Sequence, residues 1–219
     1  MVTIVGIDEA GRGPVIGPLV ICGVLIEKGD EQRLSAIGVK DSKLLTPLQR
    51  ETLFDKVLEI VKKYRILIVP AKEIDDAVEG KDNLNLNWLE AEKSAEILNH
   101  LGPDEAILDC PSNNIEKYTL YIKNKVKDKD MRIKAEHKAD LNYVVAGAAS
   151  ILAKVTRDRE IEKIKKKIKE NIGSGYPSDH VTVEFLGKNY KKYPEIFRHS
   201  WESYKRLTEG KKQKKLGEF

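Results

Sequence analysis

Five short runs rich in β-branched residues alternate with stretches of helical periodicity, and this alternation limits the folds open to the chain more than any other feature. The strand-like runs cover residues 2–8, 19–26, 65–69, 105–109 and 131–135. The helical stretches cover residues 47–64, 86–101, 114–126, 141–169 and 181–190. Strands that alternate with helices are typical of an α/β fold, and 219 residues suffice for one large domain with a real core.

Local signals set the ends of several helices. Thr46 followed by Pro47 is typical of a helix start, whereas Gly102 before a proline is typical of a helix end. The stretch 141–169 begins with the small residues 146–149, which allow close backbone packing, and then becomes rich in Lys and Glu. We therefore expect its first half to be buried and its second half to be solvated.

Charge is distributed unevenly along the chain. Residues 150–219 hold 18 Lys and Arg against 10 Asp and Glu, a net charge of +8, whereas residues 1–149 hold 21 against 25, a net charge of −4. A basic region attracts nucleic acid or another polyanion, although lysine-rich helices are often only solvated surfaces. Charge alone leaves both interpretations open.

Cysteine usage and hydropathy exclude several classes of protein. Cys22 and Cys110, the only cysteines, are far apart and form no Cys-x-x-Cys motif, so we expect neither a disulfide framework nor a thiolate zinc site. The longest uncharged run, residues 13–26, has 14 residues and is too short to cross a bilayer. We expect a cytoplasmic protein with no membrane partner.

An adjacent pair of carboxylates, Asp8 and Glu9, stands at the end of the first apolar run and precedes a Gly-Arg-Gly turn. Two neighbouring acids at the end of a core strand repel each other unless a cation lies between them. Neighbouring side chains of a regular strand point to opposite faces, so both acids can reach one site only if the chain bends here. We expect that bend, and we look for function at this pair.

Two further acids stand at comparable positions later in the chain. Asp109 ends the run 105–109, and Asp140 stands at the start of the small-residue helix. The carboxyl ends of neighbouring strands share one edge of an open α/β sheet, so the four acids could converge there. Oxygen ligands without a His or Cys cluster favour Mg²⁺ or Mn²⁺. Two such ions about 3.5 to 4 Å apart would suit phosphodiester hydrolysis.

Each of these later acids also has a purely structural interpretation. Asp109 could form the turn at the end of a strand, and Asp140 could be the N-cap of a helix. For either acid taken alone, the structural interpretation is the more common one. The hypothesis of a metal site depends on their occurring together with Asp8 and Glu9.

Several motifs occur in a fixed order along the chain. They are Gly-Ile-Asp-Glu-Ala-Gly-Arg-Gly-Pro at residues 6–14, Asp-Ser-Lys at 41–43, Ala-Glu-His-Lys-Ala-Asp at 135–140, Ala-Ser-Ile-Leu-Ala-Lys-Val at 149–155 and Gly-Ser-Gly-Tyr-Pro-Ser-Asp at 173–179. Together they resemble the archaeal-type ribonuclease HII family over nearly the whole chain, and an ordered set is far more specific than a lone Asp-Glu pair. The resemblance implies an α/β ribonuclease-H-like fold, with a central mixed five-stranded sheet flanked by helices and a helical C-terminal extension.

The resemblance also implies roles for individual residues. The four residues expected to be catalytic and to bind Mn²⁺ or Mg²⁺ are Asp8, Glu9, Asp109 and Asp140. The residues expected to bind substrate are Gly11, Arg12, Gly13, Lys43, Lys154 and Tyr176. The backbone of the Gly-Arg-Gly turn would sense a 2′-hydroxyl, because glycine places no side chain in the way. The tyrosine would stack under the next sugar, and the two lysines would contact phosphates.

The implied enzyme is an endoribonuclease of DNA replication and repair, and we take a monomer as the default oligomeric state. It would hydrolyse the RNA strand of RNA/DNA hybrids and cut 5′ of ribonucleotides embedded in duplex DNA, by two-metal-ion catalysis, leaving 3′-hydroxyl and 5′-phosphate ends. Two alternatives stay open, which are a metal-dependent DNA nuclease of the same fold and a module that binds hybrids without cutting them.

The resemblance and the composition together predict three regions. They are a catalytic domain over residues 1–170, a helical extension over 171–208 that contributes to substrate binding, and a flexible basic tail over 209–219. In the tail, Gln213, Leu216 and Phe219 match the Gln-x-x-hydrophobic-x-x-aromatic motif by which replication proteins bind the sliding clamp. A disordered tail that matches this short motif by chance is the alternative.

The remaining conspicuous residues have structural interpretations. His137 and His199 are assigned no catalytic role, because isolated histidines are more often structural. Trp88 and Trp201 are expected to be packing residues. The lysines between 163 and 169 are expected to form a solvated helix face that adds long-range attraction for a duplex.

Overall fold

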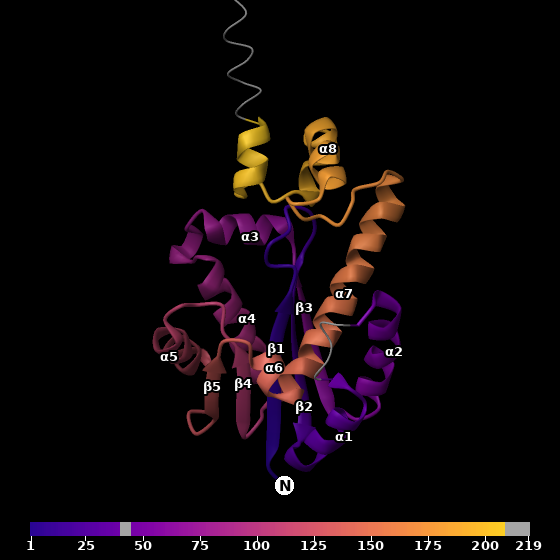
Figure 1. The fold of residues 1–219 in the computed structure, drawn as a ribbon. Helices are drawn as coiled ribbons and strands as arrows, with labels where there is room; N and C mark the ends of the chain where they lie inside the picture. The colour runs from indigo at the N-terminus through magenta and orange to yellow at the C-terminus, as the bar shows by residue number, and fades with distance from the viewer. Residues whose placement is uncertain (40–44, 209–219) are drawn as a thin grey trace, which may run out of the picture. The chain divides into compact units, whose positions relative to one another are not determined.

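The computed structural model describes residues 1–39 and 45–208, and the chain divides into two compact units (Figure 1). Unit 1 comprises residues 1–10, 20–68 and 86–157. Unit 2 comprises residues 11–19 and 69–85 and the chain from residue 158 onward. Unit 2 thus includes two segments from the first half of the chain, and an independent catalytic domain over residues 1–170 stays a prediction.

A five-stranded sheet forms the centre of unit 1, in the order β3-β2-β1-β4-β5 (Figure 1). The strands are β1 (Thr3–Ala10), β2 (Leu19–Glu27), β3 (Lys63–Val69), β4 (Glu105–Asp109) and β5 (Arg132–Glu136). β1 is antiparallel to β2 and parallel to β4, and β4 is parallel to β5. The prediction of a mixed five-stranded sheet is therefore confirmed.

Helices cover both faces of this sheet. One face packs against α1 (Glu31–Ala36), α2 (Pro47–Leu58), α6 (Ala139–Asn142) and the first part of α7 (Val144–Ile168). The other face packs against α4 (Leu86–Leu101), which contacts β1, and α5 (Ile115–Lys125), which contacts β5. A short 3₁₀ helix, η1 (Lys28–Asp30), follows β2.

The start of α7 lies directly on β1, as its small residues predicted. A side chain on Gly6 of β1 would overlap the backbone of Val145 and Ala146 in α7. Only a glycine in the strand, facing a helix of small residues, permits so close an approach. This packing brings the next turns of α7 close to the end of β1.

Two helix predictions need correction. The helix expected over residues 141–169 is two helices, because Tyr143 is extended and separates α6 from α7. The Tyr143 hydroxyl and the Asn142 amide both donate to Glu136 at the end of β5, and these hydrogen bonds stabilise the non-helical residue between α6 and α7. The helix expected over residues 47–64 begins as predicted, with Thr46 in a capping box, but it ends at Leu58 because the chain must turn into β3.

Unit 2 is built from short helices around a core of its own. It contains α3 (Ala71–Val78), η3 (Lys81–Asn83), the last part of α7, α8 (His180–Asn189), η4 (Pro194–Ile196) and helical residues 202–208. Its core includes Ile16, Ile161, Phe185 and Phe197. Across residues 1–39 and 45–208, no helix is long and apolar enough to cross a membrane.

Candidate active site

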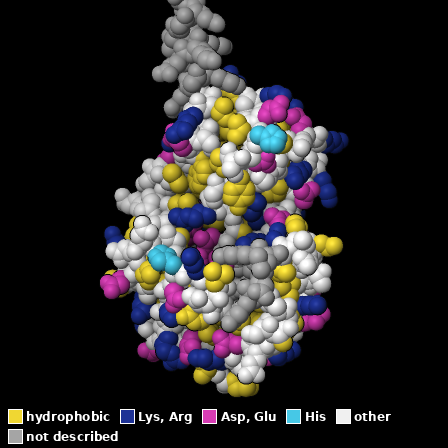
Figure 2. All heavy atoms as spheres, in the orientation of Figure 1, with side chains coloured by type: hydrophobic (Ala, Val, Ile, Leu, Met, Phe, Trp, Pro, Cys, Tyr) yellow, Lys and Arg dark blue, Asp and Glu magenta, His cyan; other side chains and the backbone are white. Residues whose placement is uncertain are grey.

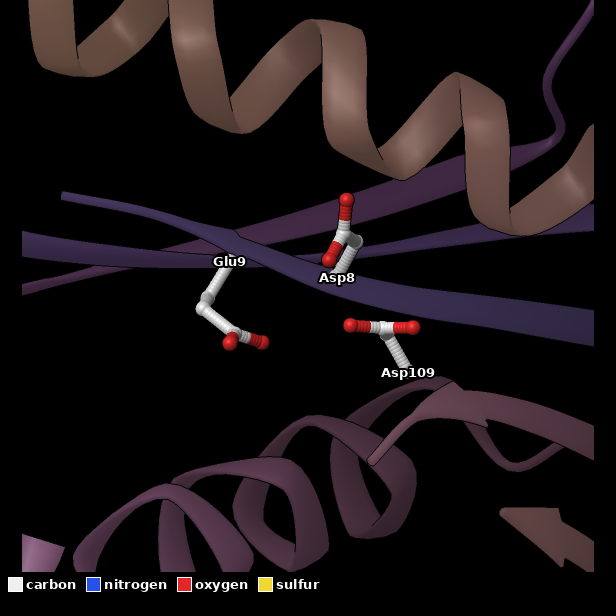
Figure 3. Close-up of side chains that lie close together, drawn as sticks. All are labelled: Asp8, Glu9 and Asp109. Carbon is white, nitrogen blue, oxygen red and sulfur yellow. The ribbon is translucent and has the colours of Figure 1, made fainter. Parts of the chain in front are cut away.

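The carboxyl ends of β1 and β4 lie side by side and bring acidic residues together. The parallel register pairs Ile7 with Leu108, so the next residue of each strand is an acid, Asp8 or Asp109. One carboxylate oxygen from each of Asp8, Glu9 and Asp109 lies within 4.8 Å of the other two (Figure 3). The predicted convergence of these three acids at the sheet edge is therefore observed.

The predicted bend between the two neighbouring acids is wrong. β1 keeps its antiparallel register with β2 through Asp8 and Glu9 and ends only at Ala10. Figure 3 shows Asp8 and Glu9 leaving β1 on opposite sides, with Asp109 projecting toward them from the end of β4. β4 ends at Asp109, beside Asp8. Beyond the end of β4 no backbone separates the two faces of β1, so the side chains of Asp8 and Glu9 can both approach Asp109.

Asp8 is buried, with 5% of its surface exposed, and its ionisation is opposed by its surroundings. The pKa of Asp8 is raised to about 7. Burial raises it most and the negative charge of Asp109 raises it as well, whereas a hydrogen bond from Ser150, the Glu9 backbone and the charge of Lys154 lower it. A divalent cation beside this carboxylate would supply the missing positive charge. The site thus brings acidic groups together where a bound cation would favour their ionised forms.

Ser150 connects Lys154 to the acidic cluster. The two residues lie one turn apart on α7, and Lys154 Nζ donates to Ser150 Oγ over 2.6 Å. Ser150 is fully buried and hydrogen-bonds to Asp8. No role was predicted for Ser150 from the sequence, although a hydroxyl in a buried apolar helix, four residues before a lysine, is a usable signal. Contact of Lys154 with a phosphate stays a prediction.

Asp140 lies next to this cluster but is not one of the three acids whose oxygens meet. The backbone N–H of Ala139 donates to Asp109 Oδ1 over 2.8 Å, so Asp140 directly follows the residue that Asp109 anchors. Asp140 is 6% exposed and is the second residue of α6, whose N-cap is Lys138. The alternative interpretation of Asp140 as an N-cap is therefore wrong.

Comparison with known proteins identifies the family. The family model described as Ribonuclease HII matches residues 5–204. The chain belongs to the ribonuclease HII family. Curated Ribonuclease HII proteins from Pyrococcus horikoshii and Thermococcus sibiricus are 47% and 46% identical to it, over 94% and 93% of this chain and 93% and 90% of their own lengths. The chain is thus a ribonuclease H, a hydrolase that cuts within nucleic-acid strands.

Solved structures of two ribonuclease HII family members share this fold. The crystal structure of the ribonuclease H2 from P. horikoshii superposes with a TM-score of 0.88 at 46% identity, covering 96% of this chain and 99% of that one. A structure titled as the PCNA:RNase HII complex from Archaeoglobus fulgidus has a TM-score of 0.81 at 39% identity, covering 93% of this chain and 96% of that one. The ribonuclease-H-like fold is confirmed.

The Gly-Arg-Gly turn at residues 11–13 lies against the predicted substrate tyrosine within unit 2. A Cβ placed on Gly13 would lie 3.6 Å from the ring of Tyr176, which is 40% exposed. The N–H groups of Val15 and Ile16 donate to the carbonyl of Gly175 over 2.8 and 3.3 Å. Two of the sequence motifs thus form one surface, although more than 150 residues separate them along the chain.

The motif at residues 173–179 is held in shape by its last residue, Asp179. Backbone and side-chain hydrogen bonds from Ser174, followed by backbone bonds from Val181 and Thr182, lower the pKa of Asp179 to about 2. A side chain on Gly173, which has φ +68°, would collide with Asp179 and Thr182. This glycine is therefore required for the loop geometry.

The lysine-rich end of α7 is paired with acids. Lys163 contacts Glu160 and Lys165 contacts Glu162, over 2.6 and 2.8 Å. On the face shown in Figure 2, Lys and Arg side chains are interspersed with Asp and Glu. These pairs support the interpretation of this helix end as a solvated face.

Several predicted site residues lie outside the described part of the chain. They are Lys43, Gln213, Leu216 and Phe219. Their assigned roles stay predictions.

Proposed function

We propose that this ribonuclease HII family member hydrolyses the RNA strand of RNA/DNA hybrids and cuts on the 5′ side of ribonucleotides embedded in duplex DNA. The products would carry 3′-hydroxyl and 5′-phosphate ends, and water would be the nucleophile. The observation that carries the proposal is the meeting of three carboxylates at the ends of β1 and β4 in a chain of this family.

The donor set fits hard divalent cations. Asp8, Glu9 and Asp109 offer only carboxylate oxygens, which Mg²⁺ and Mn²⁺ prefer. We assign these three acids and the adjacent Asp140 as ligands for two ions. When bound, the ions would activate a water and stabilise charge on the leaving oxygen.

Other residues would orient the ligands and the substrate. Ser150, which receives a hydrogen bond from Lys154, would fix the rotamer of Asp8. Lys154 would also provide positive charge for a substrate phosphate. The 11–13 turn and Tyr176 would contact the ribonucleotide and the sugar that follows it. Lys43 would contact a second phosphate.

Cleavage-site mapping tests this proposal. The substrate is an end-labelled DNA duplex that contains one ribonucleotide, and the matched control is the same duplex in DNA throughout, each with Mg²⁺, with Mn²⁺ or with chelator. We expect a single cut 5′ of the ribonucleotide, dependent on a divalent ion, and an intact control duplex. Equal cutting of both duplexes would support the DNA nuclease instead. Salt-dependent binding without cleavage under any ion would support the binding module.

We also propose that the tail binds the sliding clamp through Gln213, Leu216 and Phe219. The motif match supports this, as does the relative whose structure is titled as a PCNA complex. The test compares clamp binding by the full-length protein with binding by a chain that ends at Lys212. A Glu218→Gln variant is the matched control within the tail. We expect the truncated chain to lose binding and the control to keep it, and equal binding by all three would reject the proposal.

A further inference from the structure

Arg198 is a fully buried cation in unit 2, and its guanidinium contacts the backbone of the Gly-Arg-Gly motif. Arg198 Nη2 donates to the carbonyl of Gly11 over 2.6 Å, and Nη1 donates to the carbonyl of Arg12 over 2.9 Å. Its Nε donates to the carbonyl of Gly17 over 3.1 Å. Its exposed fraction is 0%. One side chain thus holds three carbonyls that lie more than 180 residues away in the sequence.

Trp201 completes this set of contacts. Its indole Nε1 donates to the carbonyl of Gly13 over 3.0 Å, and its ring lies 4.8 Å from the Arg198 guanidinium. The backbone N–H of Arg198 also donates to the carbonyl of Val15 over 2.9 Å. All three carbonyls of the 11–13 turn are therefore held by two side chains of one short segment.

Packing alone does not explain an arginine at this position. Burying a guanidinium is costly, and an apolar side chain of similar volume could fill the space without that cost. What Arg198 adds is a rigid fork of charged donors, which a lysine or an apolar residue cannot reproduce. Its contribution is therefore the orientation of the carbonyls that it binds.

Carbonyl orientation determines where the next N–H points. In a trans peptide the C=O and the following N–H point in opposite directions, and the peptides here are trans. With the carbonyls of Gly11 and Arg12 directed toward Arg198, the N–H groups of Arg12 and Gly13 point away from it. A cation on the carbonyl side also polarises these peptides, which strengthens their N–H groups as donors.

We propose that Arg198, assisted by Trp201, is a positioning residue for ribonucleotide discrimination, because it directs the N–H groups of the 11–13 turn toward the 2′-hydroxyl oxygen and the neighbouring phosphate. The inference rests on the proposed function, in which this turn contacts the ribonucleotide. It predicts that weakening the fork lowers the preference for a ribonucleotide more than it lowers affinity for duplex DNA.

The test measures that preference directly. Binding of a duplex with one ribonucleotide and of the matching all-DNA duplex is measured by fluorescence anisotropy in chelator, and their ratio of Kd values is compared among variants. Arg198→Met removes the fork, Trp201→Phe removes one hydrogen bond and keeps a ring, and Arg206→Met is an exposed control. We expect the ratio to fall about tenfold for Arg198→Met and about threefold for Trp201→Phe, and to stay unchanged for Arg206→Met.

Two results would overturn the inference. The first is an unchanged ratio in a folded Trp201→Phe or Arg198→Met protein, including an equal loss of affinity for both duplexes, because a merely structural role predicts that outcome. If Arg198→Met does not fold, Trp201→Phe decides. A wild-type protein without any ribonucleotide preference would instead reject the proposed function, and this inference with it.

Discussion

Two aspartates, one in each unit, show opposite electrostatic behaviour. The pKa of Asp8 in unit 1 is raised to about 7, chiefly by burial. Hydrogen bonds from Ser174, Val181 and Thr182 lower the pKa of Asp179 in unit 2 to about 2. The side chain is the same, so the difference comes from the environment. Asp8 is desolvated and lies beside another acid, while Asp179 lies in a loop whose N–H groups point at it.

The contrast separates a site whose acidic groups suit a bound cation from a loop that is held together by its own hydrogen bonds. In unit 1 the carboxylates of Asp8, Glu9 and Asp109 lie together, and burial and the charge of Asp109 oppose the ionisation of Asp8, which a bound divalent cation would favour. Such a site reduces stability for the sake of function. The loop that ends at Asp179 obtains its order from internal hydrogen bonds. Changing each aspartate should therefore have opposite effects on stability.

Replacing Asp8 with Asn should have the largest effect, because it removes a ligand from the centre of the acidic cluster. We expect turnover on a ribonucleotide-containing duplex to fall by about 10³-fold or more, with hybrid affinity nearly unchanged. Single-turnover cleavage and anisotropy measure the two quantities. Asp55→Asn, on the exposed surface of α2, is the control and should stay fully active. An active Asp8→Asn enzyme would refute the assigned role.

The same substitution should stabilise the metal-free protein. The folded-state pKa of Asp8 is raised from 3.8 to about 7, so ionisation costs stability progressively as the pH rises through this window, and the full cost applies above pH 7. Asn carries no such cost. In urea unfolding with chelator, we expect Asp8→Asn to be more stable than the wild type at pH 8, by up to roughly 4 kcal/mol, and nearly equal at pH 4. A less stable variant at pH 8 would contradict this account.

Ser150→Ala should weaken metal binding to a smaller extent. Losing the hydrogen bond that lowers the pKa of Asp8 makes the carboxylate harder to ionise. We expect Mn²⁺ affinity at pH 7 to fall about fivefold, with the deficit shrinking at higher pH. Ser35→Ala on α1 is the matched control, since its hydroxyl bonds only a backbone carbonyl within its own helix among the described contacts. A pH-independent deficit would argue against this mechanism.

Asp179→Asn should have the smallest effect and the opposite sign. The pKa of Asp179 is lowered, so its stabilisation is present above pH 3.8 and is lost as the pH falls through about 2. We expect the variant to unfold a few degrees below the wild type at pH 7. The difference should close near pH 2. Thermal unfolding at both values measures this, and a stabilising effect at pH 7 would erase the contrast with Asp8.

Much of the fold follows from local signals. The five strands lie within two residues of their predicted positions, because each β-branched run is bounded by turn residues, and α4 has the predicted ends because Gly102 stops it. α1 and α3 were not predicted, since six to eight residues give too little periodicity. The break at Tyr143 depends on hydrogen bonds to Glu136, which a single helical stretch does not reveal.

The site was predictable only in part. The strand ends and motifs predicted Asp8, Glu9 and Asp109 as site residues. The sequence did not show how Asp8 and Glu9, on opposite faces of a straight strand, both approach Asp109, because that depends on where β4 ends. The roles inferred for Ser150 and Arg198 come from tertiary contacts. In particular, Arg198 donates to backbone carbonyls near the other end of the sequence. Every residue has a backbone carbonyl, so the sequence does not indicate which ones a buried arginine will bind.

Calorimetric titration of Mn²⁺ into the metal-free protein tests most directly whether Asp8, Glu9 and Asp109 form one cation site. The wild type should show saturable binding, and Asp109→Asn should bind at least about tenfold more weakly because one of three converging carboxylates is lost. Asp55→Asn should match the wild type. Equal Mn²⁺ affinity in the wild type and Asp109→Asn would contradict a shared site at the ends of β1 and β4.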